Sequence, residues 1–143
     1  MKKFILVLVL SIILPVPALS GEKHVAAIDP DGVQRVEVTG GSYFFRPDHI
    51  VVKVNTPVEL IVKKEPSIIP HNIAMDEPGA GAGGAGGAGG AGMDFSVRLS
   101  TGPETVRFTP TETGTFEFYC DNRFLFFRSH RARGMEGVIE VVE

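Results

Sequence analysis

Apolar and polar residues alternate in several short runs along this chain. In residues 104–109 the alternation puts Val106 and Phe108 on one face, and in residues 114–120 it does the same for Phe116 and Phe118. A period of two residues is typical of a strand with one buried face. Further extended segments, bounded by turn-forming or charged residues, lie at 33–39, 43–45, 50–54, 58–62, 68–75, 95–99 and 137–142. Together these segments predict about eight short strands.

The same pattern contains no convincing long helix. Short strands that follow one another with turn residues between them indicate an all-β sandwich or barrel of antiparallel and mixed strands. The one helical element that we expect is a turn within residues 124–133, which Gly134 would end.

The first 20 residues have the pattern of a secretory signal peptide. Lys2 and Lys3 precede an apolar run over residues 4–14, and Ala18 and Ser20 are small residues at the −3 and −1 positions of a cleavage site. The apolar run is short for a transmembrane helix, so an uncleaved membrane anchor is the less favoured interpretation. We therefore expect a periplasmic or otherwise extracytoplasmic protein, which meets a membrane only if the signal stays attached.

The length of 143 residues fits one domain. Residues 21–32 are polar and lack a clear period, which predicts a flexible leader before a domain at residues 33–143. Within that domain, residues 79–92 contain only glycine and alanine and hold nine of the 17 glycines. Such a tract has few side chains to pack, so we expect a flexible loop, with a silk-like stacked sheet as the alternative.

Charge and cysteine content narrow the function. The net charge is −3 and no block of lysine or arginine spans the chain, which argues against general nucleic-acid binding. Cys120 is the single cysteine, so no intramolecular disulfide can form. Because cysteines of exported proteins are mostly paired, a lone one suggests a free thiol, an intermolecular bridge or a metal ligand.

Four residues combine into a metal-ligand set: His71, Cys120, His130 and Met135. One thiolate, two imidazoles and one thioether are the ligands of a mononuclear blue-copper site, in which the weakly bound methionine tunes the reduction potential. For each residue a structural role is the alternative: a structural histidine, a buried inert thiol, or a methionine that fills the core.

The sequence resembles the cupredoxin family of small blue-copper proteins. The resemblance rests on Pro70-His71-Asn72 and on the run from Tyr119-Cys120 through His130 to Gly134-Met135-Glu136-Gly137, and it covers most of residues 33–143. It implies an eight-stranded Greek-key β-sandwich with one type 1 copper ion at one end. It also implies that Asn72 joins the two ligand loops by hydrogen bonds, and that His130 is the exposed edge through which electrons pass.

The segment between Cys120 and His130 departs from the family pattern. It has nine residues where many cupredoxins have only a few, so we expect a more folded path and a possible distortion of the site. This loop carries residues 124–127 (FLFF) among Arg123, Arg128, Arg131 and Arg133. Either the aromatic residues plug the end of the sandwich, or they form an apolar docking face with a basic rim for an acidic partner. His24 and His49 are expected to be non-ligands.

The leading functional hypothesis is a one-electron carrier whose redox partner is a c-type cytochrome or a terminal oxidase or reductase. A copper-binding or delivery protein without redox turnover is the alternative. Enzyme activity is not expected. Multicopper oxidases need more than the four histidines present, a binuclear site needs a second cysteine, and no HExxH motif occurs.

Overall fold

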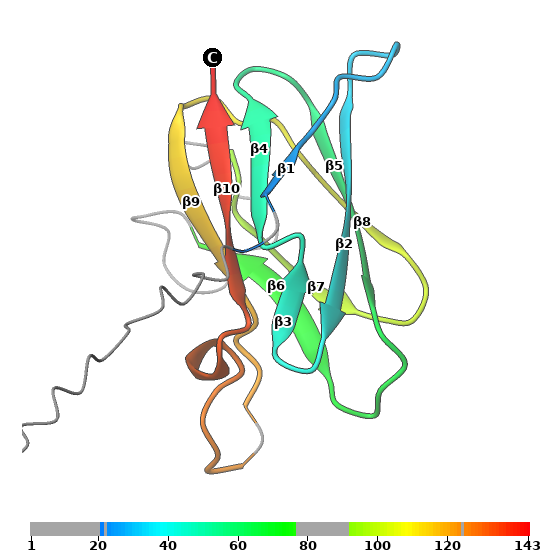
Figure 1. Ribbon diagram of the computed structural model, residues 1–143, viewed down its shortest axis with the longest axis vertical. Coiled ribbons are helices and arrows are strands. Elements are labelled where there is room, and N and C mark those ends of the chain that lie inside the picture. Colours follow the sequence, from blue (N-terminus) through cyan, green and yellow to red (C-terminus); the bar gives the residue numbers. More distant parts are fainter. Residues whose placement is uncertain (1–20, 22, 77–91, 124) are drawn as a thin grey trace, which may run out of the picture.

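The computed structural model describes residue 21 and residues 23–76, 92–123 and 125–143, and they form two packed sheets (Figure 1). The six-stranded sheet has the order β1-β4-β10-β9-β6-β7. Its strands are β1 (Lys23–Val25), β4 (His49–Lys53), β10 (Glu136–Val142), β9 (Gly114–Tyr119), β6 (His71–Met75) and β7 (Phe95–Leu99). The four-stranded sheet has the order β3-β2-β5-β8, with β3 (Phe44–Arg46), β2 (Gln34–Gly41), β5 (Val58–Lys64) and β8 (Glu104–Phe108).

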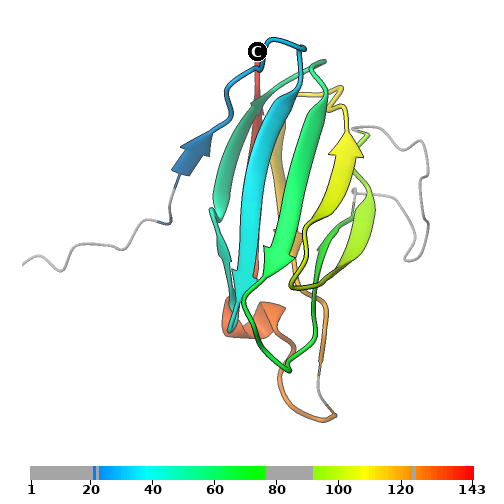
Figure 2. The ribbon, with the colours of Figure 1, turned by 90° about the vertical axis from the view of Figure 1, so that its right-hand side faces the viewer.

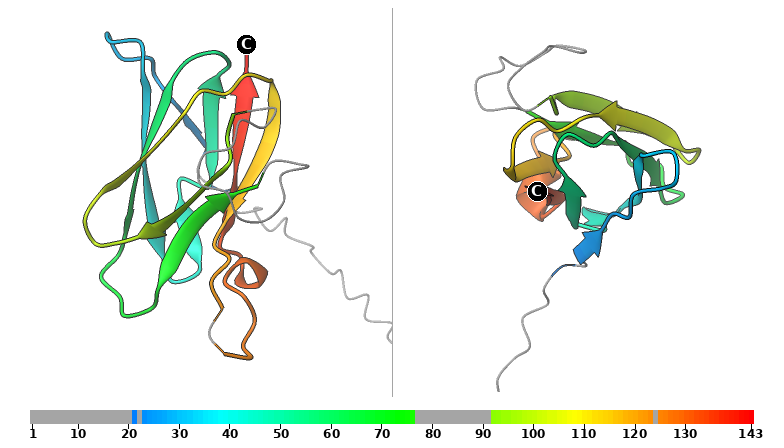
Figure 3. Two further views of the ribbon diagram at one scale, coloured as in Figure 1. Left: turned by 180° about the vertical axis from the view of Figure 1, so that it is seen from behind. Right: turned by 90° about the horizontal axis from the view of Figure 1, so that it is seen from above.

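Both sheets are mixed. In the smaller sheet, which faces the viewer in Figure 2, β2 is parallel to β5 and β5 is antiparallel to β8. In the larger sheet, β10 lies between β4, to which it is parallel, and β9, to which it is antiparallel. The end-on view in Figure 3 shows the two sheets facing each other across the core.

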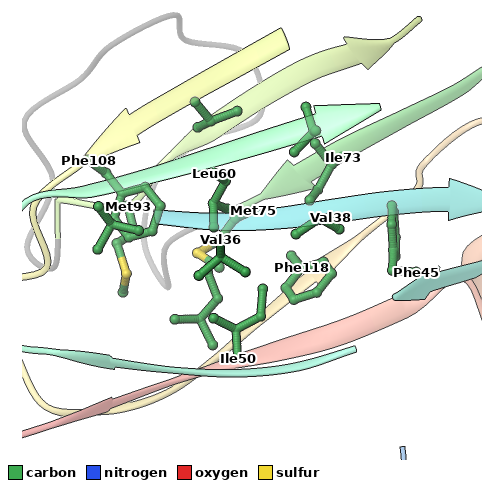
Figure 4. Close-up of a cluster of buried hydrophobic side chains, with 14 of the residues drawn as sticks. Val36, Val38, Phe45, Ile50, Leu60, Ile73, Met75, Met93, Phe108 and Phe118 are labelled. Atoms are coloured by element: carbon green, nitrogen blue, oxygen red, sulfur yellow. The ribbon is translucent and has the colours of Figure 1, made fainter. Parts of the chain in front are cut away.

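The core consists of the inward-facing residues of both sheets. Val36 and Val38 of β2 and Leu60 of β5 are at most 2% exposed, and they face Ile50, Ile73 and Phe118 of the other sheet (Figure 4). Phe45 packs edge-on against Phe118, with their ring centroids 5.3 Å apart. Alternation in the sequence therefore places one face of each strand in this core.

The all-β sandwich predicted from the sequence is confirmed, although the described residues form ten strands rather than eight. Each extended segment predicted from the alternation corresponds to a strand, within a few residues at the ends. The prediction of a flexible leader over residues 21–32 did not anticipate β1, which pairs in parallel with β4 through Lys23↔His49 and Val25↔Val51.

Two sequence predictions fall outside the described residues: the signal peptide at 1–20 and, except for Gly92, the glycine–alanine tract. Within the described part of the chain, no helix has the length and apolar character needed to cross a bilayer.

The long loop after β9 and the segment between β5 and β6 lie at the same end of the sandwich, away from the C-terminus (Figure 1). There the predicted helical turn is a 3-10 turn, η1 (Arg131–Arg133), shorter than the expected segment. Gly134 ends it in a left-handed conformation with φ of 97°, as the sequence predicted.

Candidate metal centre

The four predicted ligands come from three chain segments that meet at this end. His71 is the first residue of β6, and Cys120 directly follows β9. His130 precedes η1, and Met135 directly precedes β10. Because β9 pairs with both β6 and β10, the strand order alone brings these segments together.

Three of the predicted ligands converge on one point. His71 Nδ1 is 3.1 Å from His130 Nδ1, and Cys120 Sγ is 3.4 Å from His130 Nδ1 and 4.0 Å from His71 Nδ1. All three residues are buried, at 1%, 0% and 4% exposure for His71, Cys120 and His130. They form the one group of three or more His, Cys, Asp or Glu residues in the described part of the chain whose ligand atoms lie close enough to share a metal ion.

These separations suit a shared ion. Nitrogen and sulfur atoms that bind one first-row metal ion at about 2.0–2.3 Å are about 3.4–3.8 Å from one another. The three observed distances, 3.1, 3.4 and 4.0 Å, are close to that range. The backbone therefore already holds the three ligand atoms at separations that suit one ion. Two imidazoles and a thiolate are a donor set that copper accepts in both of its common oxidation states, so the residues present fit a copper ion.

Met135 lies beside this cluster and is fully buried. Its backbone carbonyl accepts a hydrogen bond from Cys120 N at 3.0 Å, and its N–H donates to His130 O at 3.1 Å. The end of its side chain packs near Gly40 of β2, where an added Cβ would be 3.3 Å from Met135 Cε and 2.9 Å from Leu99 Cδ1. Glycine at position 40 therefore leaves room for the methionine.

Asn72 joins the two ligand segments, as the resemblance implied. Its Oδ1 accepts hydrogen bonds from Asp121 N and Asn122 Nδ2, each at 3.1 Å, and from Cys120 Sγ at 3.2 Å. Its backbone N–H points to Cys120 Sγ at 3.5 Å. One side chain next to His71 thus fixes the position of the thiol and of the residues that follow it.

The long loop closes on itself before it reaches the cluster. His130 N donates to Asn122 O at 2.9 Å, and Arg131 N donates to Cys120 O at 3.0 Å. The two ends of the loop, at Asn122 and His130, therefore lie side by side. The second histidine approaches Cys120 as though only Asp121 and Asn122 lay between them, so the added length lies outside the cluster.

Burial favours the neutral form of both imidazoles. The pKa of His71 is lowered from 6.5 to about 4, chiefly by loss of solvent, with smaller contributions from the nearby His130 and Lys64. The pKa of His130 is lowered in the same way by burial and secondarily by Arg133. Neutral imidazoles have the free electron pairs that metal binding requires. His71 Nε2, on the other side of the ring, is buried with no hydrogen-bond partner in the described structure.

The expectation that His130 is an exposed edge is wrong, because the residue is only 4% exposed. Tyr43 packs edge-on against its ring, with the centroids 5.1 Å apart. Arg133 in turn lies 4.7 Å from the centre of the Tyr43 ring. Tyr43 has a left-handed backbone, with φ of 67°, in the turn between β2 and β3. The sequence did not predict that Tyr43 covers the His130 ring, since no motif or spacing near either residue indicates that they are neighbours.

The loop itself is turned outward. Leu125, Phe126 and Phe127 are 66%, 88% and 49% exposed, so these three residues do not plug the sandwich; Phe124 lies outside the described residues. Ile68, across from them, is fully exposed. A cavity of about 400 Å³ between Ile68 and Phe127 reaches His130, and its lining also includes Arg123, Arg128 and Arg133. In the described structure none of these three arginines forms an ion pair.

The remaining histidines lie away from the cluster, as expected. His24 is exposed on β1, and His49 Nε2 contacts Glu140 at 2.7 Å.

Two mixed sheets with a buried His–Cys–His cluster at one end define a small β-sandwich metalloprotein. Residues 33–142 match the profile of copper binding proteins of the plastocyanin/azurin family. The chain therefore belongs to that family, the cupredoxins. No curated protein matches it.

Several solved structures have a similar fold. The metal-binding domain of the Cu(I)-exporting P-type ATPase CopA from Streptococcus pneumoniae D39 is 21% identical, with a TM-score of 0.59 over 87% of this chain and 99% of that one. Dithionite-reduced auracyanin from Roseiflexus castenholzii is 22% identical, with a TM-score of 0.57 over 76% and 97%. The periplasmic domain of cytochrome oxidase subunit II (CoxB) from Bradyrhizobium japonicum is 16% identical, with a TM-score of 0.52 over 76% and 83%. At these identities the similarity shows the fold.

Proposed function

We propose that this protein is an exported one-electron carrier in which a single type 1 copper ion is bound by His71, Cys120 and His130, with Met135 as the fourth ligand. The observation that carries this proposal is the cluster of two imidazole nitrogens and one thiol sulfur, all buried and within 4.8 Å of one another. When bound in such a site, copper alternates between its +1 and +2 states.

The surroundings of the cluster suit that role. Electron transfer is fast when the ligands move little between oxidation states, and here Asn72 and the backbone bonds of Cys120 and His130 hold them in place. All three residues are buried, and with Met135 as a fourth ligand the proposed site has no position left open for a substrate on the metal. This supports a carrier rather than an enzyme, since catalytic metal sites keep an open position.

Copper delivery without redox turnover is the alternative, and the fold is also that of the CopA metal-binding domain solved with Cu(I). Delivery proteins often present exposed methionines to Cu(I). In the described residues the methionines are Met75, Met93 and Met135, and each is at most 1% exposed. Their burial favours the electron carrier.

The outward face of the long loop supports docking to a redox partner. It combines exposed apolar side chains, Ile68 and Leu125 to Phe127, with Arg123 and Arg128 beside the cavity that reaches His130. An acidic rim around an apolar centre would complement it. Auracyanin and the subunit II domain have the same fold, and we propose a c-type cytochrome or a terminal oxidase or reductase as the partner class.

Adding Cu(II) to the purified exported protein and recording its absorption and paramagnetic resonance spectra tests this function. We expect an intense visible band from the cysteine thiolate to Cu(II), and reversible one-electron cycling. Cys120→Ser should abolish the band and greatly weaken copper binding, whereas Met135→Leu should keep copper and raise the potential. A colourless, readily lost Cu(I) would instead support delivery, and an unchanged spectrum of Cys120→Ser would refute the site.

A further inference from the structure

Asp48, in the connection between β3 and β4, has an unpaired buried oxygen. Its Oδ1 has no hydrogen-bond partner, and among the described residues only His71 Nε2 shares this state. Burying a carboxylate oxygen without a hydrogen-bond donor costs free energy of folding, so such an oxygen usually has a partner in the mature protein. The backbone of Asp48 is well held, since its carbonyl accepts a hydrogen bond from Val138 N at 2.8 Å.

Gly21 lies directly against this carboxylate. A Cβ atom added to Gly21 would overlap both oxygens of Asp48, so only glycine fits here without a shift of the aspartate. The nitrogen of a residue is about 2.5 Å from its Cβ position. Since the added Cβ would lie 2.1 Å from Oδ1, the Gly21 nitrogen lies at most about 4.6 Å from that oxygen, close enough for a small movement of the aspartate side chain to form an ion pair.

In the sequence, Gly21 is the residue that follows the predicted cleavage site at Ala18-Leu19-Ser20. When a signal peptidase cleaves there, water breaks the peptide bond. Ser20 leaves with a new carboxylate, and the Gly21 nitrogen becomes an amine that takes up a proton. An amide nitrogen with one hydrogen thus becomes a cation with three donors.

We propose that removal of the signal peptide creates the missing partner of Asp48: the new α-ammonium group of Gly21 binds the Asp48 carboxylate and fastens β1 to the edge of the six-stranded sheet. The proposal rests on the predicted export and not on copper binding.

The other charged groups near this edge are already engaged with one another. Glu140 of β10 accepts from Lys23 of β1 at 3.0 Å and contacts His49 of β4 at 2.7 Å. Glu140 therefore satisfies Lys23 and His49, and Asp48 is left for the N-terminus. Apart from these side-chain contacts, β1 is held by its backbone pairing with β4, because the side chains of all three of its residues are exposed.

The test begins with the mass of the exported protein, which we expect to start at Gly21. The α-amine is then titrated by NMR in the copper-free protein. Because Asp48 stabilises the ammonium form, its pKa should exceed the ordinary value of about 7.7–8.0 by about 0.5–1 unit, which is roughly a three- to tenfold change in proton affinity. Lys23 and His49 are the other basic side chains nearby, so the shift must be assigned by substitution.

Asp48→Asn should return this pKa to its ordinary value, and Gly21→Ala should reduce the shift because the added methyl group displaces the carboxylate. Glu112→Gln, which removes an exposed acid in the loop between β8 and β9, is the matched control and should leave the shift intact. An N-terminus other than Gly21, or an α-amine pKa that Asp48→Asn does not move, would overturn the proposal. The shift should survive in Cys120→Ser, so failure of the copper site and failure of this ion pair are distinguishable.

Discussion

Replacement of Asn72 by alanine tests the connection between the two ligand segments. The substitution removes the Oδ1 atom that accepts hydrogen bonds from Asp121 N and Asn122 Nδ2 at 3.1 Å and from Cys120 Sγ at 3.2 Å. The backbone N–H of residue 72 remains and still points to Cys120 Sγ. The change therefore separates the role of the side chain from that of the strand.

The magnitude follows from the bonds that are lost. Each N–H donor that loses a partly buried acceptor costs about 1 kcal/mol, and the thiol is a weaker donor. We expect the free energy of unfolding of the copper-free protein to fall by about 2–3 kcal/mol. Since residues that orient metal ligands typically contribute 10–100-fold to metal affinity, copper should also dissociate more readily by about that factor.

Urea unfolding of the copper-free protein and competition with a chelator measure these two quantities. Asn122→Ala is the comparison variant, because it removes one donor from the same acceptor and a longer contact of 3.7 Å to Cys120 Sγ, but leaves Asp121 N and Cys120 Sγ bound to Asn72 Oδ1. It should cost about 1 kcal/mol. If Asn72→Ala destabilises the protein no more than Asn122→Ala does, and copper affinity is unchanged, the side chain does not join the two segments.

Three further predictions concern the surroundings of the cluster. Gly40→Ala should lower the stability by about 1–3 kcal/mol in thermal unfolding, because its methyl group would meet Leu99 and Met135, whereas Gly102→Ala, whose methyl would lie 3.7 Å from Ser100 Oγ, should have little effect. The pKa of His71 is about 4 in the folded state and 6.5 in the unfolded state. Above about pH 6.5 the imidazole is neutral in both states; as the pH falls from 6.5 towards 4 the unfolded state binds a proton that the folded state does not, so the free energy of unfolding falls. In the copper-free protein we expect the free energy of unfolding to fall by about 3 kcal/mol over this range, and to depend less on pH in His71→Gln. If urea unfolding gives the same pH profile for both proteins, the burial of His71 does not lower its pKa. Replacing Arg123 and Arg128 by glutamate should slow reduction of the copper-loaded protein by hexacyanoferrate(II) about tenfold and reverse its salt dependence. Arg98→Glu, an exposed change on β7, is the control in stopped-flow measurements, and an equal effect there would argue against a local basic rim.

The strands were predicted well where one face is buried, because burial of one face requires apolar and polar residues to alternate along the strand. In β2 and β5, Val36, Val38 and Leu60 follow this rule. Strand β1 obeys no such rule, since Lys23, His24 and Val25 are all exposed. It forms by pairing with β4, and a three-residue edge strand held by backbone bonds leaves no hydrophobic pattern.

The chemistry of the candidate site was predictable from residue types, while its cover was not. A lone cysteine, two histidines and a methionine have few uses together, so His71, Cys120 and His130 could be grouped before any fold was known. The burial of His130 depends instead on Tyr43, which is 87 residues distant in the sequence and held in a left-handed turn. Contacts of that kind follow from how the turn between β2 and β3 meets the ligand end, which no local pattern encodes.

The length of the loop between Cys120 and His130 made a distorted site an expectation, and the backbone shows how the added length is kept away from the cluster. The bonds from His130 N to Asn122 O and from Arg131 N to Cys120 O join the two ends of the loop at its base. A segment closed in this way can vary in length and sequence without moving the imidazole, because the entropy of closing a loop changes slowly with its length. Residues 123–129 are therefore free to specify the surface that a partner meets, while Asn72 and the strand ends specify the cluster. Copper affinity and partner choice should accordingly respond to different sets of substitutions.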